Sequence, residues 1–349
     1  MEKSLIIIGA GIAGLSTGCY AQMNGYESQI FEMHDKPGGV CTSWKRNGYT
    51  FDGCIDWLTG TNPSDPFYQI WQELGALQGR SIVNHDELLR IKSTSGRALT
   101  IYANVDRLEQ HLKEIAPVDA KVIGELCQTI RQISQEGGFQ RFFMSIRSES
   151  ADLPQWVRGT VQEFASRLQD PFLRETFLQG FGNMEGMMFL LLYLALQNMK
   201  DGGYPIGGSL SFARAIERRY IRLGGEVHYG ARVVRILVEH DRAVGVRLHN
   251  GMEYRAERVI SAADGHATIF EMLEGKYLDD EIRGYYDTWP VFPPLIQVSL
   301  GVARDFSSEP PRISLPLREP ITIGGKTLSH LDLKHYCYDP TMAPLGKWS

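Results

Sequence analysis

The chain has 349 residues, of which 43% are hydrophobic and 22% are charged, and its formal net charge is -5. This length is sufficient for two domains with separate hydrophobic cores. The weakly negative charge argues against a nucleic-acid partner, which requires a basic surface. The five cysteines contain no C-x-x-C pair, so we expect reduced thiols and a cytoplasmic protein. The histidines show no metal-ligand spacing, and we expect no metal site.

The first stretch of the chain predicts a β-α-β unit. Residues 4–8 form a continuous apolar run, as in a buried parallel strand, and residues 27–31 predict the second strand. Between them, residues 13–23 predict a helix. The turn after the first strand reads GAGIAG, which fits the dinucleotide fingerprint G-x-G-x-x-G in its required context.

Each glycine of this turn has a distinct expected role. Gly9 permits the tight turn, Gly11 lets a pyrophosphate approach the backbone, and Gly14 lets the helix pack close to the strand. The helix N-terminus offers free N–H groups to phosphate. Glu32, directly after the second strand, is placed to accept hydrogen bonds from ribose hydroxyls, which disfavours NADP. These residues alone leave FAD and NAD open.

Farther along the chain the pattern changes. Residues 88–102 predict a hairpin that turns at Ser95-Gly96, and helical periodicity follows through residue 196. Glycines and a proline interrupt it near residues 202–208. A helix is expected over 210–222, followed by short strands with turns at Asp241-Arg242 and Asn250-Gly251. Strand-like, proline-containing sequence follows residue 290.

A second set of motifs separates the two cofactors. The segment HDKPGGVCTSWKRNGYTFDG, residues 34–53, resembles a signature of the FAD-containing family that includes phytoene desaturases, carotenoid isomerases, retinol saturases and amine oxidases. The shared features are the Gly38-Gly39 pair and the G-Y-T-F-D block at 48–52. Residues 204–236 and the segment VISAAD, 259–264, extend the resemblance over nearly the whole chain.

The resemblance implies FAD as the cofactor, and no second G-x-G-x-x-G suggests another dinucleotide site. It implies an α/β fold: a Rossmann-like FAD-binding domain, residues 1–87 and 204–289, interrupted by an α+β substrate domain, residues 88–203 and 290–349. In this reading the Val233 backbone contacts the adenine. The implied cofactor-binding residues are Gly9, Gly11, Ile12, Ala13, Gly14, Glu32, Gly38, Gly39, Val40, Ser43, Val233 and Ala263.

Two departures from the family pattern affect the site. Many relatives have Arg after the Gly-Gly pair, whereas this chain has Val40, so Lys36, Lys45 or no residue supplies that charge. Cys54 occupies a usual glycine position near the flavin ring. A small buried cysteine is the commoner interpretation of it.

Two nearby aspartates are candidates for proton handling. We interpret Asp52 as a structural residue of its turn, and Asp56 is open between a solvated and a functional role. The catalytic residues are unknown from sequence.

The subgroup that the motifs most resemble acts on polyenes and other isoprenoids. The resemblance implies desaturation, saturation or cis-trans isomerisation of an apolar substrate. The apolar run at 187–196 fits either a substrate tunnel or a buried helix, and it is shorter than the ~20 residues of a membrane span. Peripheral membrane contact is expected. Two alternatives remain: an amine oxidase-like flavoprotein, or a non-catalytic isoprenoid carrier like the Rab GDP-dissociation inhibitors.

The two ends of the sequence also give expectations. The strand that begins at residue 4 leaves no room for a signal peptide. The final residues, HYCYDPTMAPLGKWS, follow a stretch that resembles the middle of the family's substrate domain. We expect a truncated member that keeps the adenine and ribose half of the site, lacks part of the isoalloxazine half, and binds FAD weakly. The alternative is a naturally short enzyme with a rearranged pocket.

Overall fold

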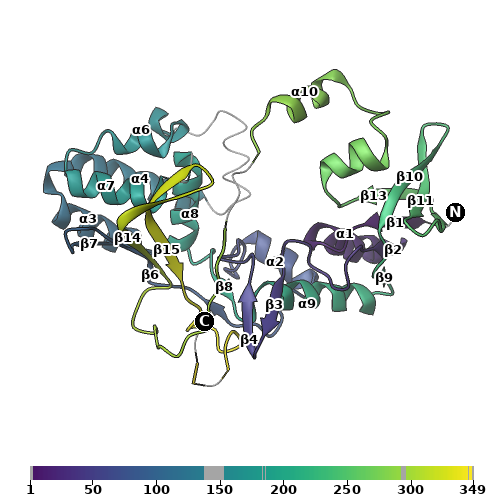
Figure 1. Ribbon diagram of the computed structural model, residues 1–349, viewed down its shortest axis with the longest axis horizontal. Helices are drawn as coiled ribbons and strands as arrows, with labels where there is room; N and C mark the ends of the chain where they lie inside the picture. Colours follow the sequence, from purple (N-terminus) through teal and green to yellow (C-terminus); the bar gives the residue numbers. More distant parts are fainter. Residues whose placement is uncertain are drawn as a thin grey trace. The chain divides into compact units, whose positions relative to one another are not determined.

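The computed structural model describes residues 3–136, 153–182, 184, 186–291, 296–344 and 346–347 (Figure 1). The chain forms two compact units. The first comprises residues 1–55, 71–79 and 207–300, and the second comprises residues 56–70, 80–206 and 301–349. These bounds differ from the predicted ones at 56–70, 80–87 and 204–206, which belong to the second unit, and at 290–300, which belongs to the first. Hydrogen bonds to the segment before residue 204 account for 56–70, because the Leu58 N–H donates to the Gly203 carbonyl and the Asn62 N–H donates to the Asp201 carboxylate. Within the second unit, β5 (Ile82–Val83) pairs with β8 (Tyr204–Pro205). The functional roles assigned to the two domains stay predictions.

A four-stranded parallel sheet forms the centre of the first unit, with the order β13-β1-β2-β9. Its strands are β1 (Ser4–Ile8), β2 (Glu27–Phe31), β9 (Glu226–His228) and β13 (Arg258–Ser261). The predicted strands over 4–8 and 27–31 are thus correct to the residue. The sequence pattern is strong there because parallel strands are buried on both faces and read as continuous apolar runs.

Helices α1 (Ile12–Met23) and α9 (Gly208–Arg222) pack against each other beside this sheet. Tyr220 of α9 is fully buried, and its hydroxyl donates a hydrogen bond to the carbonyl oxygen of Ser28 at 2.6 Å. A Cβ on Gly18 of α1 would lie 2.7 Å from the Tyr220 ring, and a Cβ on Gly225 would lie 2.1 Å from it. The ring therefore excludes any side chain at both positions.

A second sheet in the same unit is antiparallel and consists of β10 (Val233–Glu239), β11 (Arg242–Leu248) and β12 (Glu253–Arg255). Its turn lies at His240-Asp241, one residue before the predicted position, and both residues have positive φ. Side chains from this sheet pack with Ile6, Ile8 and Phe31 of the parallel sheet. The remaining elements of the unit are a hairpin of β3 (Ser43–Arg46) and β4 (Tyr49–Asp52), a π-helical segment (Ala267–Met272) and α10 (Asp280–Thr288).

The second unit combines helices with a mixed sheet of order β15-β14-β6-β7. The sheet strands are β6 (Glu87–Lys92), β7 (Ala98–Tyr102), β14 (Arg312–Ile323) and β15 (Lys326–Lys334). β6 and β7 form the predicted hairpin. The helices are α3 (Val105–Ile115), α4 (Ala120–Glu136), α6 (Val161–Ala165), α7 (Pro171–Phe181) and α8 (Met187–Asn198), with 3-10 turns at Pro117–Asp119 and Gln155–Arg158. Helix α2 (Pro66–Glu73) spans the boundary between the units' segments.

Helix α8 is the apolar run for which the sequence left two interpretations. Residues 190–196 of this helix are all buried in the core of the second unit, whereas Phe189 is 53% exposed. Most of α8 is therefore core, because its apolar residues surround the whole helix and not one face of it. Among the described helices, none combines the length and hydropathy that a bilayer span requires.

Candidate functional site

The glycine turn of the first unit has the geometry that the sequence predicts. Gly9 has φ +97°, and its N–H donates to the Phe31 carbonyl at 2.8 Å. A Cβ on Gly14 would lie 1.9 Å from the Gly9 carbonyl oxygen. Both positions thus require glycine for the protein's own packing: Gly9 because of its backbone conformation and Gly14 because of the close approach of helix to turn.

Gly11 differs from its neighbours in this turn. It has an extended backbone, with φ -68° and ψ 177°, that any residue can adopt, and no atom lies within 4 Å of where its Cβ would be. Gly11 caps α1 without a side-chain hydrogen bond, so the first N–H groups of the helix lack a capping side chain. This open space at a helix N-terminus fits a pyrophosphate.

Glu32 lies against this turn, and its side chain is buried. One carboxylate oxygen accepts the Ala10 N–H at 2.7 Å, and the other accepts the His34 N–H at 2.9 Å. These two bonds fix the carboxylate at the carboxyl end of β2, beside the start of α1. The position suits recognition of a ribose, which stays a prediction for this residue.

The Gly-Gly pair is the third part of the same cradle. The Gly38 N–H donates to the Ala10 carbonyl at 2.8 Å, and a Cβ on Gly39 would lie 3.4 Å from the Gly11 Cα. Both glycines have positive φ, +114° and +59°. The structure thus brings together the glycine turn, Glu32 and the Gly-Gly pair, which come from separate segments.

The remaining predicted cofactor residues lie at the edge of this cradle or in the core. Val40 is exposed, Ser43 is buried, and Val233 is buried at the start of β10. Ala263 is exposed, and its nitrogen would lie 3.6 Å from a Cβ on Gly9. Ile12 and Ala13 form the first turn of α1. None of these placements is itself a cofactor contact, so their binding roles stay predictions.

The basic residue sought in place of the family arginine has a nearby candidate. Lys36 donates to the Ser43 carbonyl at 3.2 Å and lies over the Trp44 ring at 5.6 Å. Lys45, on β3, is exposed. Lys36 is thus held against the hairpin that follows the Gly-Gly pair, and the phosphate role of either lysine stays a prediction.

Asp52 has a structural role, in agreement with its interpretation from sequence. It is 2% exposed, and its carboxylate accepts hydrogen bonds from both the N–H and the hydroxyl of Ser209. The Cys54 N–H also donates to it. A buried carboxylate is stabilised there by several donors and by the N-terminal end of α9.

The expectation of a buried Cys54 is wrong, because this side chain is exposed. Its neighbour across the hairpin, Cys41, is buried, and its thiol donates to the Ser209 carbonyl at 3.5 Å. Contact with Cys54 and burial both raise the pKa of Cys41.

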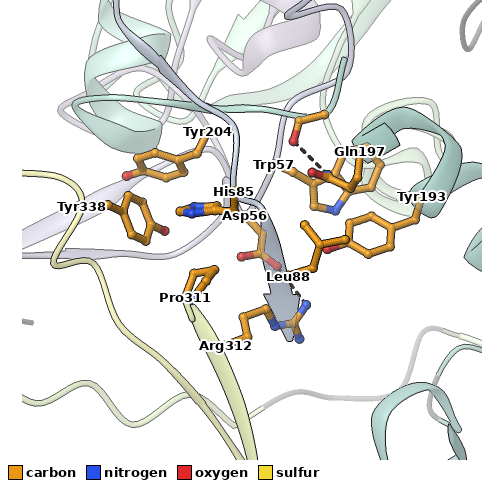
Figure 2. A pocket seen from close by; sticks show the side chains of 11 residues that line it. Asp56, Trp57, His85, Leu88, Tyr193, Gln197, Tyr204, Pro311, Arg312 and Tyr338 are labelled. Carbon is orange, nitrogen blue, oxygen red and sulfur yellow. Dashed lines mark hydrogen bonds and ion pairs between the residues drawn. The ribbon is translucent and has the colours of Figure 1, made fainter. Parts of the chain in front are cut away.

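A pocket in the second unit is the other candidate site (Figure 2). Eleven residues line it, from segments spread over most of the chain, and five of them carry aromatic rings: Asp56, Trp57, His85, Leu88, Tyr193, Gln197, Gly202, Tyr204, Pro311, Arg312 and Tyr338. Of these, Asp56 was a candidate from sequence, Tyr193 lies in the apolar run 187–196 that fits a substrate tunnel, and Tyr204 begins the segment 204–236 that resembles the family. No sequence pattern predicted that these residues would meet in one pocket.

Asp56 holds the charged side of this pocket together. Its carboxylate pairs with Arg312 at 3.2 Å and with Lys334 at 2.5 Å. Burial acts to raise the pKa of Asp56, but Lys334 and Arg312 outweigh it and hold that pKa below its usual range. Asp56 is therefore an ionised carboxylate with both oxygens already occupied by cations, and it is unsuited to accept a proton near neutral pH.

His85 is the uncharged member of the same cluster. Its ring meets the Tyr338 ring edge-on at 4.5 Å. Burial, together with His335 and Lys334, lowers the pKa of His85 to about 4. His85 is thus neutral near pH 7. Among the described residues, no group of three or more His, Cys, Asp or Glu side chains could hold a metal ion.

Comparison with known proteins identifies the family. The profile described as flavin containing amine oxidoreductase matches residues 12–336. The chain belongs to this family. It is 27% identical over 290 residues to a lycopene-forming phytoene desaturase of Pseudescherichia vulneris, covering 78% of this chain and 58% of that protein. It is 24% identical over 328 residues to the prolycopene isomerase of Daucus carota, covering 87% of this chain and 53% of that protein.

The family also accounts for the fold and the cofactor. A structure from Pyrococcus furiosus matches 99% of this chain and 78% of its own length, with a TM-score of 0.67 and 17% identity, which supports the Rossmann-like α/β fold. FAD is the cofactor, as the sequence predicts, and the cradle around Gly11 fits it. The chain spans only somewhat more than half the length of the curated relatives it matches.

Proposed function

We propose that this protein is an FAD-dependent oxidoreductase that acts on a long apolar polyene or isoprenoid, by desaturation, saturation or cis-trans isomerisation. The observation that carries the proposal is the open space at the Gly11 Cβ position, in a turn that hydrogen bonds join to Glu32 and Gly38. The names of the relatives, phytoene desaturase and prolycopene isomerase, support a polyene as the substrate class.

The residues of the first unit would hold FAD in a defined order. The N–H groups at the start of α1 and the Gly9 to Gly14 turn bind the pyrophosphate, Glu32 binds the adenosine ribose, and the Val233 backbone contacts the adenine. Lys36 adds a positive charge beside the Gly-Gly pair. When bound, FAD supplies hydride or electron transfer, and the protein's part is to bind, orient and exclude water.

The pocket of the second unit is the proposed site for part of the substrate. Aromatic faces, with Leu88 and Pro311, offer apolar contact to a chain of double bonds. The amine oxidase alternative has less support here. A protonated amine would need a free carboxylate, and both oxygens of Asp56 already pair with cations.

The proposal is tested by cofactor content and turnover together. The purified protein is incubated with FAD, separated from free flavin by gel filtration, and its visible spectrum recorded. It is then mixed anaerobically with phytoene in phosphatidylcholine vesicles, and separately with putrescine, and bleaching of the flavin is followed with chromatography of the products. Bound flavin with changed phytoene and unchanged putrescine supports the proposal. Flavin that is bleached by putrescine alone would favour the amine oxidase alternative, and absence of bound flavin would overturn the proposal.

We also propose that the protein meets its apolar substrate at a membrane surface without spanning it. Flotation with the same vesicles tests this. Protein recovered with the vesicles only when they contain phytoene would fit delivery from the lipid phase, whereas protein that never floats would contradict it.

A further inference from the structure

Two cysteines of the first unit meet at the open end of the β3–β4 hairpin. Beyond the last pair of its ladder, the Gly53 N–H donates to the Thr42 carbonyl at 3.1 Å, so the two segments stay paired for one more residue. The next opposed positions are Cys41 and Cys54. Their thiol groups contact each other, and both cysteines are free.

The register gives these two cysteines a position that a disulfide bond can bridge. Hydrogen-bonded and non-hydrogen-bonded pairs alternate along an antiparallel ladder, and the bond from Gly53 to Thr42 makes positions 41 and 54 a non-hydrogen-bonded pair. In a regular ladder the Cα atoms of such a pair lie about 4.5 Å apart. Disulfides form at Cα separations of about 4.4–6.8 Å. The backbone therefore needs little rearrangement for the two sulfur atoms to bond.

The two thiols differ in their access to solvent, which sets the order in which they react. Cys54 is exposed, whereas Cys41 is buried and its thiol donates to the Ser209 carbonyl at 3.5 Å. Contact with Cys54, burial and the charge of Asp52 raise the pKa of Cys41, so this sulfur stays protonated near pH 7 and is a poor nucleophile. An exposed thiol with a second thiol beside it is the arrangement of redox-sensitive cysteines.

We propose that Cys41 and Cys54 form a redox-sensitive disulfide site, with a low-molecular-weight disulfide such as oxidised glutathione as the oxidant. The Cys54 thiolate attacks one sulfur of the oxidant, forms a mixed disulfide and releases one glutathione thiolate. Cys41 then gives its proton to this thiolate and attacks the Cys54 sulfur, which breaks the mixed disulfide and releases the second glutathione. The protein loses two electrons and two protons, and one oxidised glutathione becomes two reduced ones.

The site lies beside the cofactor cradle. The Cys41 N–H donates to the Gly38 carbonyl at 2.9 Å, and the Gly38 N–H donates to the Ala10 carbonyl of the glycine turn. A covalent bond from Cys41 to Cys54 would therefore tie the Gly-Gly segment to the end of β4. The inference goes beyond the proposed function, because neither the polyene substrate nor a catalytic step enters it.

The test measures which thiols of the purified full chain are lost on oxidation. The protein is reduced, freed of reductant and incubated anaerobically with oxidised glutathione, and a sample without glutathione gives the starting thiol content. Remaining thiols are alkylated, and tryptic peptides are analysed by mass spectrometry. Lys45 and Arg46 lie between the two cysteines, so only a disulfide keeps their peptides joined. The joined form should be at least ~10-fold more abundant than glutathionylated Cys54, because the neighbouring thiol has a high effective concentration.

Three variants locate the reaction. Cys41→Ser keeps a donor for the Ser209 carbonyl but removes the resolving thiol, so Cys54 should retain one glutathione. Cys54→Ser removes the exposed thiol, and Cys41 should stay free because it is buried. Cys337→Ser is the matched control: this thiol is half-buried and, within the described part of the chain, no second cysteine acts on it, so the joined peptides should form as in the unmodified protein.

Each outcome decides the inference. Joined peptides in the unmodified protein and in Cys337→Ser, together with their absence in the other two variants, would support it. Glutathione that stays on Cys54 in the unmodified protein would overturn it, because Cys41 would then fail to resolve the mixed disulfide. A Cys54 that does not react would overturn it as well. Flavin binding and phytoene turnover play no part in these measurements, so a failure of the proposed function leaves their result unchanged.

Discussion

The two candidate sites of this protein are built in opposite ways. The cradle in the first unit is made mostly of backbone, from short segments whose glycines meet around Gly11. The pocket in the second unit is made of side chains, from segments that extend from Asp56 to Tyr338. A backbone cradle needs particular residues at fixed spacing, because only glycine permits its turns and close approaches. A side-chain pocket needs only complementary groups that the fold brings together, so it leaves no local pattern in the sequence.

The largest expected effect is that of Gly14→Val, which disrupts the packing of the glycine turn itself. Gly14→Val places a Cβ only 1.9 Å from the Gly9 carbonyl oxygen, and backbone must move to relieve the clash. We expect a loss of about 3 kcal/mol or more in the free energy of unfolding, together with loss of FAD. Thermal unfolding followed by circular dichroism measures it. If the variant unfolds at the same temperature as the unmodified protein, the turn does not have the described geometry.

Gly11→Val is expected to break binding while leaving the fold in place. The backbone of Gly11 suits valine and the Cβ meets no protein atom, so stability should fall by about 1 kcal/mol or less. Bound flavin after gel filtration should fall at least ~10-fold, because the side chain occupies the space of the pyrophosphate. Gly284→Val is the control, since Gly284 also has open space around its Cβ position but lies on α10. Equal flavin in the Gly11 and Gly284 variants would contradict the cradle.

Asp56→Asn tests the ion pairs beside the pocket of the second unit. The change leaves Arg312 and Lys334 without their carboxylate. We expect the free energy of unfolding to fall by about 1–2 kcal/mol. This is less than for a fully buried ion pair, because the Asp56 side chain is 35% exposed. The folded-state pKa of Asp56 lies below its ordinary value of 3.8. Its contribution is therefore fully present above that value and is lost as the pH falls below it.

Urea unfolding at several pH values tests this dependence. The difference in the free energy of unfolding between the unmodified protein and Asp56→Asn should be constant near neutral pH and should become smaller in acid. A gap that is the same at pH 7 and in strong acid would show that the pairing contributes nothing. Flavin content should stay unchanged, in contrast to the glycine variants.

Near neutral pH, His85→Gln is expected to have the smallest effect of these variants on the free energy of unfolding, and its main effect is on the pH dependence of that free energy. The pKa of His85 is lowered from 6.5 to about 4 in the folded protein. As the pH falls through this window the unfolded chain gains a proton that the folded protein does not, so the folded state loses stability. Replacing His85 should remove its contribution to the slope of the free energy of unfolding against pH between pH 6.5 and pH 4. The exposed His249, changed to Gln, serves as control. Identical pH slopes of the free energy of unfolding for the two variants would contradict a lowered pKa of His85.

The difference between the sites also explains what the sequence could and could not predict. Strands β1 and β2 and helix α1 were predicted nearly to the residue, and Gly9 has the predicted tight-turn conformation, because buried parallel strands and glycine turns have strong local patterns. The interpretation of Asp52 as structural was right, although its partner Ser209 lies on α9, far away in the sequence. The exposure of Cys54 could not be predicted, because the two cysteines at this end of the hairpin differ in burial and no local pattern distinguishes them.

The pocket of the second unit could not be predicted from the sequence. Arg312 and Tyr193 lie far apart in the chain, and no spacing rule relates the start of β14 to the middle of α8. The assignment of residues 56–70 to the second unit was missed for the same reason. The Asn62 N–H donates to the Asp201 carboxylate and the Leu58 N–H donates to the Gly203 carbonyl, and no motif in the sequence predicts either bond.

The Tyr220 ring, which fills the space beside two glycines, has a consequence for how this sequence can vary. A Cβ at position 18 or at position 225 would meet the same aromatic ring. The residues at positions 18, 220 and 225 therefore constrain one another during evolution. Lineages that keep the phenol should keep both glycines, and lineages with a smaller residue at position 220 become free to acquire alanine at either one. A single substitution at the ring would thus relax constraint at two sites that lie more than two hundred residues apart in the chain.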